Sequence, residues 1–187
     1  MGQYYTPVIT RGSDIKTYCC YDYDNGAKLM EHSYIGNNFT ETVLKQLLNR
    51  PGRLAWVGDY AEPSDVKSEL ALDFINIEGK SDDFKDEPSE IGDNENSFLL
   101  VYINETKKEY IRIRNYVLRN GANQWGAIIH PIPLLTAIGN GKGGGDYRGI
   151  NENLVGRWAC DEILAMRGLD ESYKEYTDIT DFVTFKE

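Results

Sequence analysis

The sequence predicts an α+β fold: a mainly antiparallel β-sheet with one clear amphipathic helix, at about residues 38–49, packed on it. Short segments in which apolar and polar residues alternate recur along the chain, with turn residues between them, as in antiparallel strands. Only one segment repeats its apolar residues at helical spacing over several turns. The chain has 187 residues, of which 41% are hydrophobic, so it is long enough to bury a core. We therefore expect residues 1–187 to form a single domain.

The N-terminal residues predict a hairpin that opens the sheet. Residues 3–10 and 15–22 alternate apolar and polar positions, and Gly12 lies in the turn between them. The adjacent Cys19 and Cys20 fall within the second of these strands. Because the sequence has neither a CxxC motif nor a spaced His/Cys group, its cysteines indicate neither a disulfide framework nor a zinc site.

Residues 38–48, "NFTETVLKQLL", predict the helix. Their apolar residues share one face, and Asn38 with Glu41 matches the pattern of a capping box. Pro51 and Gly52 end the helix. The next segment, "RLAWVGDYA", contains the aromatic and β-branched residues that are typical of a buried strand. We therefore expect the helix to pack on the sheet that this strand joins.

Residues 81–97 contain seven acidic residues and one lysine, together with Pro88 and Gly92. This composition predicts an acidic solvated loop rather than a linker between two domains. Long-range attraction steers the encounter of such a loop with a basic surface. We expect four of its acids to contact a partner: Asp82, Asp83, Asp86 and Glu87.

Residues 97–117, "SFLLVYINETKKEYIRIRNYV", predict a second hairpin. The return strand turns its isoleucines to one face and Arg112 and Arg114 to the other, solvated face. Together with Lys107 and Lys108 in the turn, these arginines would form the basic patch of a nucleic-acid-binding protein. This patch is one alternative for function.

Two more strands are predicted in the C-terminal part of the chain, at residues 153–166 and 176–185. In the first of them, Cys160 shares a face with Trp158. That position favours a buried, unreactive thiol over a nucleophile.

Residues 139–149, "GNGKGGGDYRG", contain six glycines. A phosphate-binding P-loop needs Ser or Thr after its GK pair, and here Lys142 is followed by Gly143. The GxGxxG spacing is present, but the flanking residues do not form the strand–turn–helix unit on which dinucleotide binding depends. Two interpretations stay open: a turn or interaction loop, or a small anion site. The anion site would consist of Gly141, Lys142, Gly143, Gly144 and Arg148.

No catalytic group follows from residue spacing, and three residues are candidates: His32, Asp59 and Asp146. His32 lies in "LMEHSY", which we interpret as a polar loop, and a carboxylate could orient its ring for acid–base chemistry. His130 lies between isoleucine and proline, which favours a structural role. No motif indicates a metal site or a cofactor, and we expect neither.

Tyrosine is in excess, with thirteen in the chain. A tyrosine combines a large ring with a polar hydroxyl and is common at protein interfaces. We expect Tyr4, Tyr5, Tyr21 and Tyr23 to contact a partner. Thirty acidic and twenty basic residues give a net charge of -10, which repels nucleic acid and anionic membranes and favours a basic protein partner.

No apolar segment has the length of a membrane span, and the N-terminal residues lack the pattern of a signal peptide. We therefore expect a cytoplasmic protein with no membrane partner.

Four segments together, "MGQYY", "LMEHSY", "WVGDYAE" and "GNGKGGGDYRG", resemble a group of small uncharacterised proteins of gut bacteria and of their phages and mobile elements. The resemblance spans most of the chain and implies no catalytic residue. In size and acidity the chain also resembles type II anti-CRISPR proteins. That resemblance implies an inhibitor carried by a phage or mobile element, which occupies a basic surface of a host nuclease.

The sequence as a whole thus predicts a non-catalytic protein-binding module, whose sharpest form is an anti-defence inhibitor of an RNA-guided host nuclease. Its contact surface would combine the tyrosine-rich N-terminal segment, the acidic loop and the glycine loop. The alternative is a small hydrolase or a nucleotide-binding protein in which His32, Asp59 and the glycine loop share one pocket. Binding of nucleic acid through the basic hairpin is the third interpretation.

Overall fold

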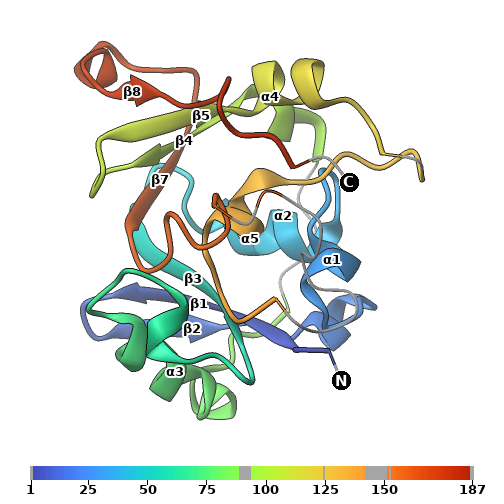
Figure 1. The fold of residues 1–187 in the computed structure, drawn as a ribbon, viewed down its shortest axis with the longest axis vertical. Coiled ribbons are helices and arrows are strands. Elements are labelled where there is room, and N and C mark those ends of the chain that lie inside the picture. The colour runs from blue at the N-terminus through green and yellow to red at the C-terminus, as the bar shows by residue number, and fades with distance from the viewer. Residues whose placement is uncertain (1, 89–93, 124, 142–150, 152, 186–187) are drawn as a thin grey trace.

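In the computed structural model, which describes residues 2–88, 94–123, 125–141, 151 and 153–185, one eight-stranded sheet takes strands from along the whole chain (Figure 1). The strands are β1 (Tyr5–Arg11), β2 (Asp14–Thr17), β3 (Gly52–Gly58), β4 (Leu100–Asn104), β5 (Glu109–Arg112), β6 (Ala137–Ile138), β7 (Glu162–Arg167) and β8 (Thr177–Asp178). Their order is β2-β1-β3-β7-β4-β5-β8, with β6 beside β3, and most pairs are antiparallel. The predicted α+β class is confirmed.

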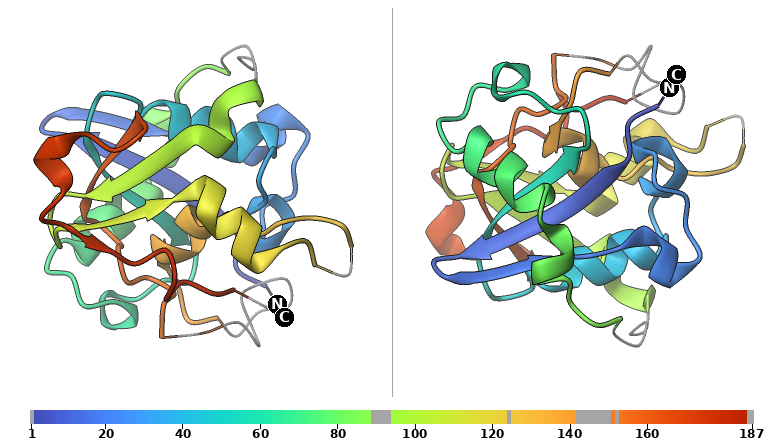
Figure 2. Two further views of the ribbon diagram at one scale, coloured as in Figure 1. Left: turned by 90° about the horizontal axis from the view of Figure 1, so that it is seen from above. Right: turned by 90° about the horizontal axis from the view of Figure 1, so that it is seen from below.

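Helices lie on both faces of this sheet. The α-helices are α1 (Leu29–His32), α2 (Asn38–Lys45), α3 (Ala71–Glu78), α4 (Ile113–Asn120) and α5 (Pro131–Leu135), and the 3-10 helices are η1 (Cys20–Tyr23), η2 (Pro63–Asp65), η3 (Ser81–Phe84), η4 (Asn94–Leu99) and η5 (Glu171–Tyr173). In Figure 2, α3 lies in front of β1 and β3 in the view from below, on the face opposite α2 and α5. No helix within the described residues is long and apolar enough to cross a membrane.

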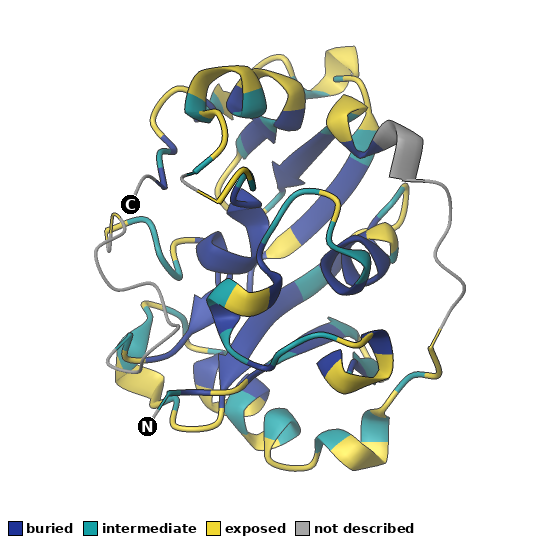
Figure 3. Ribbon diagram, turned by 90° about the vertical axis from the view of Figure 1, so that its right-hand side faces the viewer, coloured by how far each residue is buried: buried dark blue, intermediate teal, exposed yellow. Residues whose placement is uncertain are grey.

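Strand β3 shows how the two faces are built. Its alternate side chains Leu54 and Trp56 enter the large core with α2 and α5, whereas Ala55 and Val57 pack toward α3 on the other face. All four are buried, as expected for a strand that is covered on both sides. Figure 3 shows these buried strands running through the middle of the molecule.

The N-terminal hairpin is confirmed, but its second strand is shorter than predicted. Gly12 has φ +61° at the turn, and β2 ends at Thr17, which pairs with Val8. The next residue of β2 would face Pro7, which has no N–H to donate to a ladder. The chain therefore leaves β1 at this point, and Cys19 and Cys20 lie outside the strand in which they were predicted.

The predicted helix is present as α2, with a different N-cap. Asn37 and not Asn38 caps it, because the Asn37 side chain accepts a hydrogen bond from the Thr40 amide at 3.1 Å. Glu41 reaches back to the Gly36 amide at 3.0 Å. The capping-box spacing favoured Asn38, because Glu41 follows it by three residues, but asparagine caps equally well one position earlier.

The β4–β5 hairpin is confirmed, but its return strand stops at Arg112 and α4 begins at Ile113. Arg114 therefore lies on a helix, not on the strand face where it was predicted. Helix α5 was also not predicted. It begins at Pro131, and buried His130 caps it by accepting a hydrogen bond from the Ile132 amide at 3.2 Å, so the structural role expected for His130 is confirmed.

The two C-terminal strands are shorter than predicted. Within residues 153–166 the strand begins only at Glu162, and within residues 176–185 it consists of Thr177–Asp178 alone. Cys160 has φ +63°, outside any strand. It is nevertheless buried, and burial raises the pKa of its thiol to about 12, in agreement with the predicted unreactive thiol.

The described part of the segment predicted as one acidic solvated loop is attached to the sheet. It contains η3 and η4, and Lys85 forms a parallel bridge with Thr17. The Asp86 amide donates to the Thr17 carbonyl at 2.9 Å. Asp86 also binds Lys16 at 2.8 Å and accepts a hydrogen bond from Tyr18 at 3.1 Å. This acid therefore holds the segment against β2 through contacts within the chain.

Candidate binding groove

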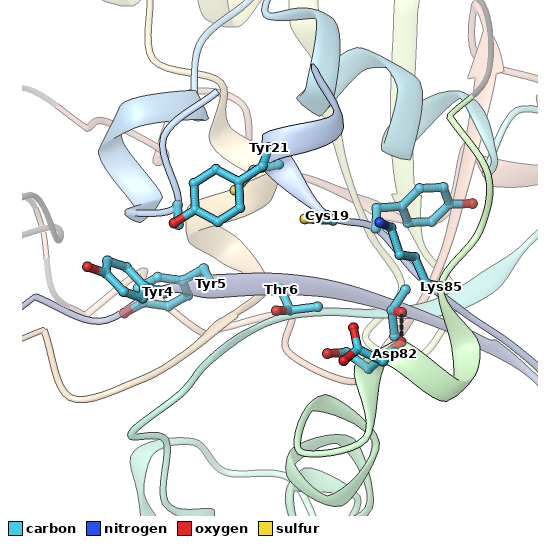
Figure 4. Close-up of a pocket in the computed structure, with 12 residues that line it drawn as sticks. Tyr4, Tyr5, Thr6, Cys19, Tyr21, Asp82 and Lys85 are labelled. Atoms are coloured by element: carbon cyan, nitrogen blue, oxygen red, sulfur yellow. Dashed lines mark hydrogen bonds between the residues drawn. The ribbon is translucent and has the colours of Figure 1, made fainter. Parts of the chain in front are cut away.

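A cavity of about 130 Å³ opens where β2 leaves β1 (Figure 4). We call it the tyrosine groove. It is lined by Tyr4, Tyr5, Thr6, Thr17, Tyr18, Cys19, Cys20, Tyr21, Ala27, Ser81, Asp82 and Lys85. Ligand pockets for drug-sized molecules enclose about 300–1,000 Å³, so this groove has room for a single side chain.

The first wall is the N-terminal end of β1. Side chains alternate along a strand, so Tyr5 points into the core and is 2% exposed, whereas Tyr4 is 52% exposed and lies with Thr6 on the groove side. Asp59, at the end of β3, fixes Tyr4 through two hydrogen bonds. Its carboxylate accepts from the Tyr4 amide at 3.1 Å, and its own amide donates to the Tyr4 carbonyl at 3.0 Å.

The second wall is the segment that leaves β1 and enters η1. Tyr21 is 64% exposed there, and Figure 4 shows the hydroxyl end of its ring directed toward Tyr4. Desolvation and then the nearby Cys20 and Tyr4 raise the pKa of Tyr21, which agrees with two neighbouring hydroxyls. Cys20 is buried, and burial raises the pKa of its thiol to about 11.

The third wall is η3, which the Thr17 hydroxyl holds by donating to the Ser81 carbonyl at 2.7 Å. The Lys85 ammonium lies 2.8 Å from the Asp22 carboxylate. This hydrogen bond is the main cause of the raised pKa of Lys85, and the charge of Asp82 adds a smaller effect. The Asp82 side chain is exposed and forms no ion pair with any residue that the structure describes. One end of the groove is thus aromatic and the other acidic.

The structure brings together only part of the predicted contact surface. Tyr4, Tyr21 and Asp82 come from three segments and line the same groove. Tyr5 lines its floor but is buried. Tyr23 is 7% exposed, with its ring 5.5 Å from that of Phe39 in the core. The burial of both rings in the core counts against the expectation that Tyr5 and Tyr23 contact a partner.

The remaining predicted acids do not line the groove. Asp83 and Glu87 are exposed on or after η3, close in sequence to Asp82, whereas Asp86 is held by Lys16 and Tyr18. Asp83 and Glu87 therefore add negative charge near the groove without contributing to its lining.

His32 does not lie in a polar loop, as the sequence suggested, but is completely buried at the end of α1. Its Nε2 accepts a hydrogen bond from the Trp56 indole at 3.1 Å, so Nδ1 carries the proton and donates to the Gly26 carbonyl at 3.0 Å. Burial lowers the pKa of His32 to about 4. Both ring nitrogens are used inside the protein, and His32 and Asp59 do not meet in the groove.

The glycine loop lies mostly outside the described residues. This applies to Asp146, Lys142, Gly143, Gly144 and Arg148. Gly141 is described and has φ +64°. At Gly139 a Cβ would lie 2.4 Å from the Gln3 side-chain oxygen and 2.5 Å from the Tyr5 hydroxyl, so this glycine is needed because two side chains approach the backbone closely.

The opposite end of the sheet has the basic residues of the β4–β5 hairpin. Three of them are already paired with acids: Lys107 with Asp161, Lys108 with Glu105 at 3.6 Å, and Arg112 with Asp178 at 3.3 Å. Arg114 is exposed and has no partner among the described residues. Three of the four cations of the predicted basic patch are thus paired with acids of the same chain.

Tyrosines take part in this pairing. The Lys108 ammonium lies 4.8 Å from the centre of the Tyr176 ring, and the Arg112 guanidinium 5.3 Å from that of Tyr110. We call this region the paired edge; it comprises residues 104–112 and the residues that bind them, Arg157, Trp158, Asp161, Tyr173, Tyr176 and Asp178.

Within the described part of the chain, no group of three or more His, Cys, Asp or Glu side chains is placed to bind a metal ion. The chain matches no protein-family model, no curated protein and no solved structure. Among the groove residues that sequence reasoning missed are Thr6, Cys19 and Lys85. The sequence signal that could have located the groove was Pro7. This proline interrupts a strand pattern and marks where the neighbouring strand β2 leaves β1.

Proposed function

We propose that this protein is a non-catalytic protein-binding module that contacts its partner through the tyrosine groove. The observation that carries the proposal is that Tyr4, Tyr21 and Asp82, which are far apart in the sequence, line one cavity. Two of them are exposed tyrosines, the kind of residue that anchors protein interfaces. The net charge of -10 and the exposed acids of η3 favour a partner with a basic surface.

Site-specific photocrosslinking tests this proposal. Tyr21 is replaced by p-benzoylphenylalanine, and the protein is irradiated in lysate of a bacterial host. Tyr60 provides the matched control, because it is 54% exposed and does not line the groove. We expect a discrete protein adduct from position 21 that position 60 does not give. Equal adducts from both positions, or none from position 21, would contradict the proposal.

In the sharpest form of the proposal, the partner is an RNA-guided host nuclease and the protein is an anti-defence inhibitor. Support for this form comes from charge, since such nucleases hold their guide and target in a positively charged channel. The test measures binding of a purified, guide-loaded type II nuclease at low and at physiological ionic strength. Replacing Asp82, Asp83 and Glu87 by their amides should lower the association rate severalfold and weaken its dependence on salt. Asp86 is left unchanged because it holds η3 in place. Absence of nuclease binding would contradict this form and leave the crosslinking test to decide the broader one.

A further inference from the structure

The paired edge shows how this protein binds a cation. At two places a cation donates a hydrogen bond to a tyrosine hydroxyl and lies beside a carboxylate: Lys108 with Tyr176 at 2.7 Å and Glu105, and Arg112 with Tyr110 at 3.2 Å and Asp178. The hydroxyl oxygen accepts a hydrogen bond from the cation, and the carboxylate attracts the cation through its charge. Each arrangement is complete within the chain.

The tyrosine groove contains the same kinds of group without the cation. Tyr4 and Tyr21 present exposed rings, and Asp82 presents a carboxylate that forms no ion pair with the described residues. Lys85 also lines the groove, but its ammonium is bound to Asp22 at 2.8 Å. The Lys85–Asp22 pair has no net charge, so the carboxylate of Asp82 gives the groove an excess of negative charge.

We infer that the tyrosine groove binds the guanidinium group of an arginine side chain that the partner protein presents. This inference rests on the proposed function, since it names what the partner inserts. The aliphatic stem of an arginine packs along the tyrosine rings at one end of the groove, while the fork of N–H donors on its guanidinium faces Asp82 at the other end. The cavity of about 130 Å³ suits one such side chain on an otherwise flat contact.

Two capped pentapeptides test the inference, Gly-Gly-Arg-Gly-Gly and its citrulline counterpart, which keeps the shape of arginine and lacks the charge. Binding is followed by the backbone amide NMR signals of the protein. We expect the arginine peptide to shift the signals of residues 4–6, 19–21 and 81–85, and to bind about tenfold more tightly than the citrulline peptide. Equal affinity for both peptides, or shifts elsewhere on the protein, would overturn the inference.

Matched variants locate the effect. Tyr21→Ala and Asp82→Asn should each weaken binding of the arginine peptide about threefold to tenfold. Tyr60→Ala and Asp83→Asn, with similar exposure but outside the lining, should leave it unchanged. The signals of untouched residues report whether each variant is folded. If Asp82→Asn binds as tightly as the unaltered protein, the carboxylate has no part in binding and the inference fails.

The outcomes of the peptide test and of the crosslinking test are independent of each other. Binding of the arginine peptide in the groove, without a crosslinked protein at position 21, would preserve the guanidinium site and contradict the proposed function. A crosslinked partner, combined with equal affinity for the arginine and citrulline peptides, would preserve the function and overturn the inference.

Discussion

The two ends of the sheet use similar residues in different ways. At the paired edge, tyrosines, acids and cations of the same chain satisfy one another, as in the contacts of Glu105 with Tyr173, Tyr176 and Lys108. At the tyrosine groove, beside β1 and β2, exposed tyrosines and Asp82 face solvent. The difference separates residues whose polar groups pair within the chain from residues whose side chains face solvent. It also explains why composition alone, with its many tyrosines and acids, could not locate the site.

The largest effect is expected at the paired edge, at Asp161. This buried carboxylate accepts hydrogen bonds from Lys107 and from buried Asn104, the latter at 2.7 Å. Asp161→Ala would leave the Asn104 amide without a partner, and we expect a loss of about 2–3 kcal/mol in the free energy of unfolding. Urea denaturation measures it. Asp181→Ala is the control, because its ion pair with Arg119 is exposed and should cost less than about 0.5 kcal/mol. Equal losses in the two variants would remove the distinction between buried and exposed pairs.

Acidification should lower the stability of the two ends of the sheet at different pH values. Burial lowers the pKa of His32, on the groove side of the core, from 6.5 to about 4. The folded protein therefore holds this ring neutral while the unfolded chain protonates it, so its stabilising contribution is complete above pH 6.5 and declines as the pH falls toward 4. The decline is about 1.4 kcal/mol per pH unit for one such histidine. Burial also lowers the pKa of His130, to about 3, which adds a similar slope.

At the paired edge the acid-sensitive group is Glu109. Burial raises the pKa of this carboxyl, but hydrogen bonds from Arg157 and Trp158 outweigh that effect and lower it below 4.5. Its contribution is therefore present above pH 4.5 and is lost only as the pH falls through the lowered pKa. Urea denaturation between pH 7 and pH 4.5 should show a shallower decline for His32→Gln than for the unaltered protein. An unchanged slope in this variant would contradict the buried neutral ring.

A smaller effect is expected at Glu105. Its two carboxylate oxygens accept hydrogen bonds from Tyr173 at 2.9 Å and from Tyr176 at 2.7 Å. Glu105→Gln replaces one acceptor by a donor, and we expect a loss of about 1 kcal/mol in the free energy of unfolding. Glu171→Gln, at a side chain that is 94% exposed, is the control and should change nothing measurable. If both variants behave alike, the tyrosine contacts do not stabilise this edge.

How much the sequence could predict depends on whether a feature is local. The hairpin around Gly12, the helix α2 and the strand β3 each carry their pattern within a few residues, and all three are present. The end of β2 depends on Pro7 in the neighbouring strand. Apolar and polar residues continue to alternate past Arg112, but β5 ends there because α4 begins at the next residue. Tertiary pairing decides both, so single-segment periodicity missed them.

The candidate site shows the same limit. Of the residues that sequence clustering selected, Tyr4, Tyr21 and Asp82 are exposed and line the groove, whereas Tyr5 and Tyr23 are buried in the core. Adjacent residues on a strand face opposite sides, so this choice depended on knowing which side the sheet buries. His32 was misjudged for a related reason. Its polar neighbours suggested a loop, whereas the Trp56 indole that binds its ring comes from β3.

The smallest effects on stability are expected in the groove itself. Tyr21→Ala and Asp82→Asn remove exposed side chains that contribute no packed core contact or ion pair among the described residues, so each should change the free energy of unfolding by less than about 0.5 kcal/mol. Urea denaturation checks this, with Tyr60→Ala as the control. A residue that contributes little to folding but much to binding belongs to a site. The same two variants should therefore weaken binding of the arginine peptide while Tyr60→Ala does not, and a large loss of stability in either would instead assign the groove to the scaffold.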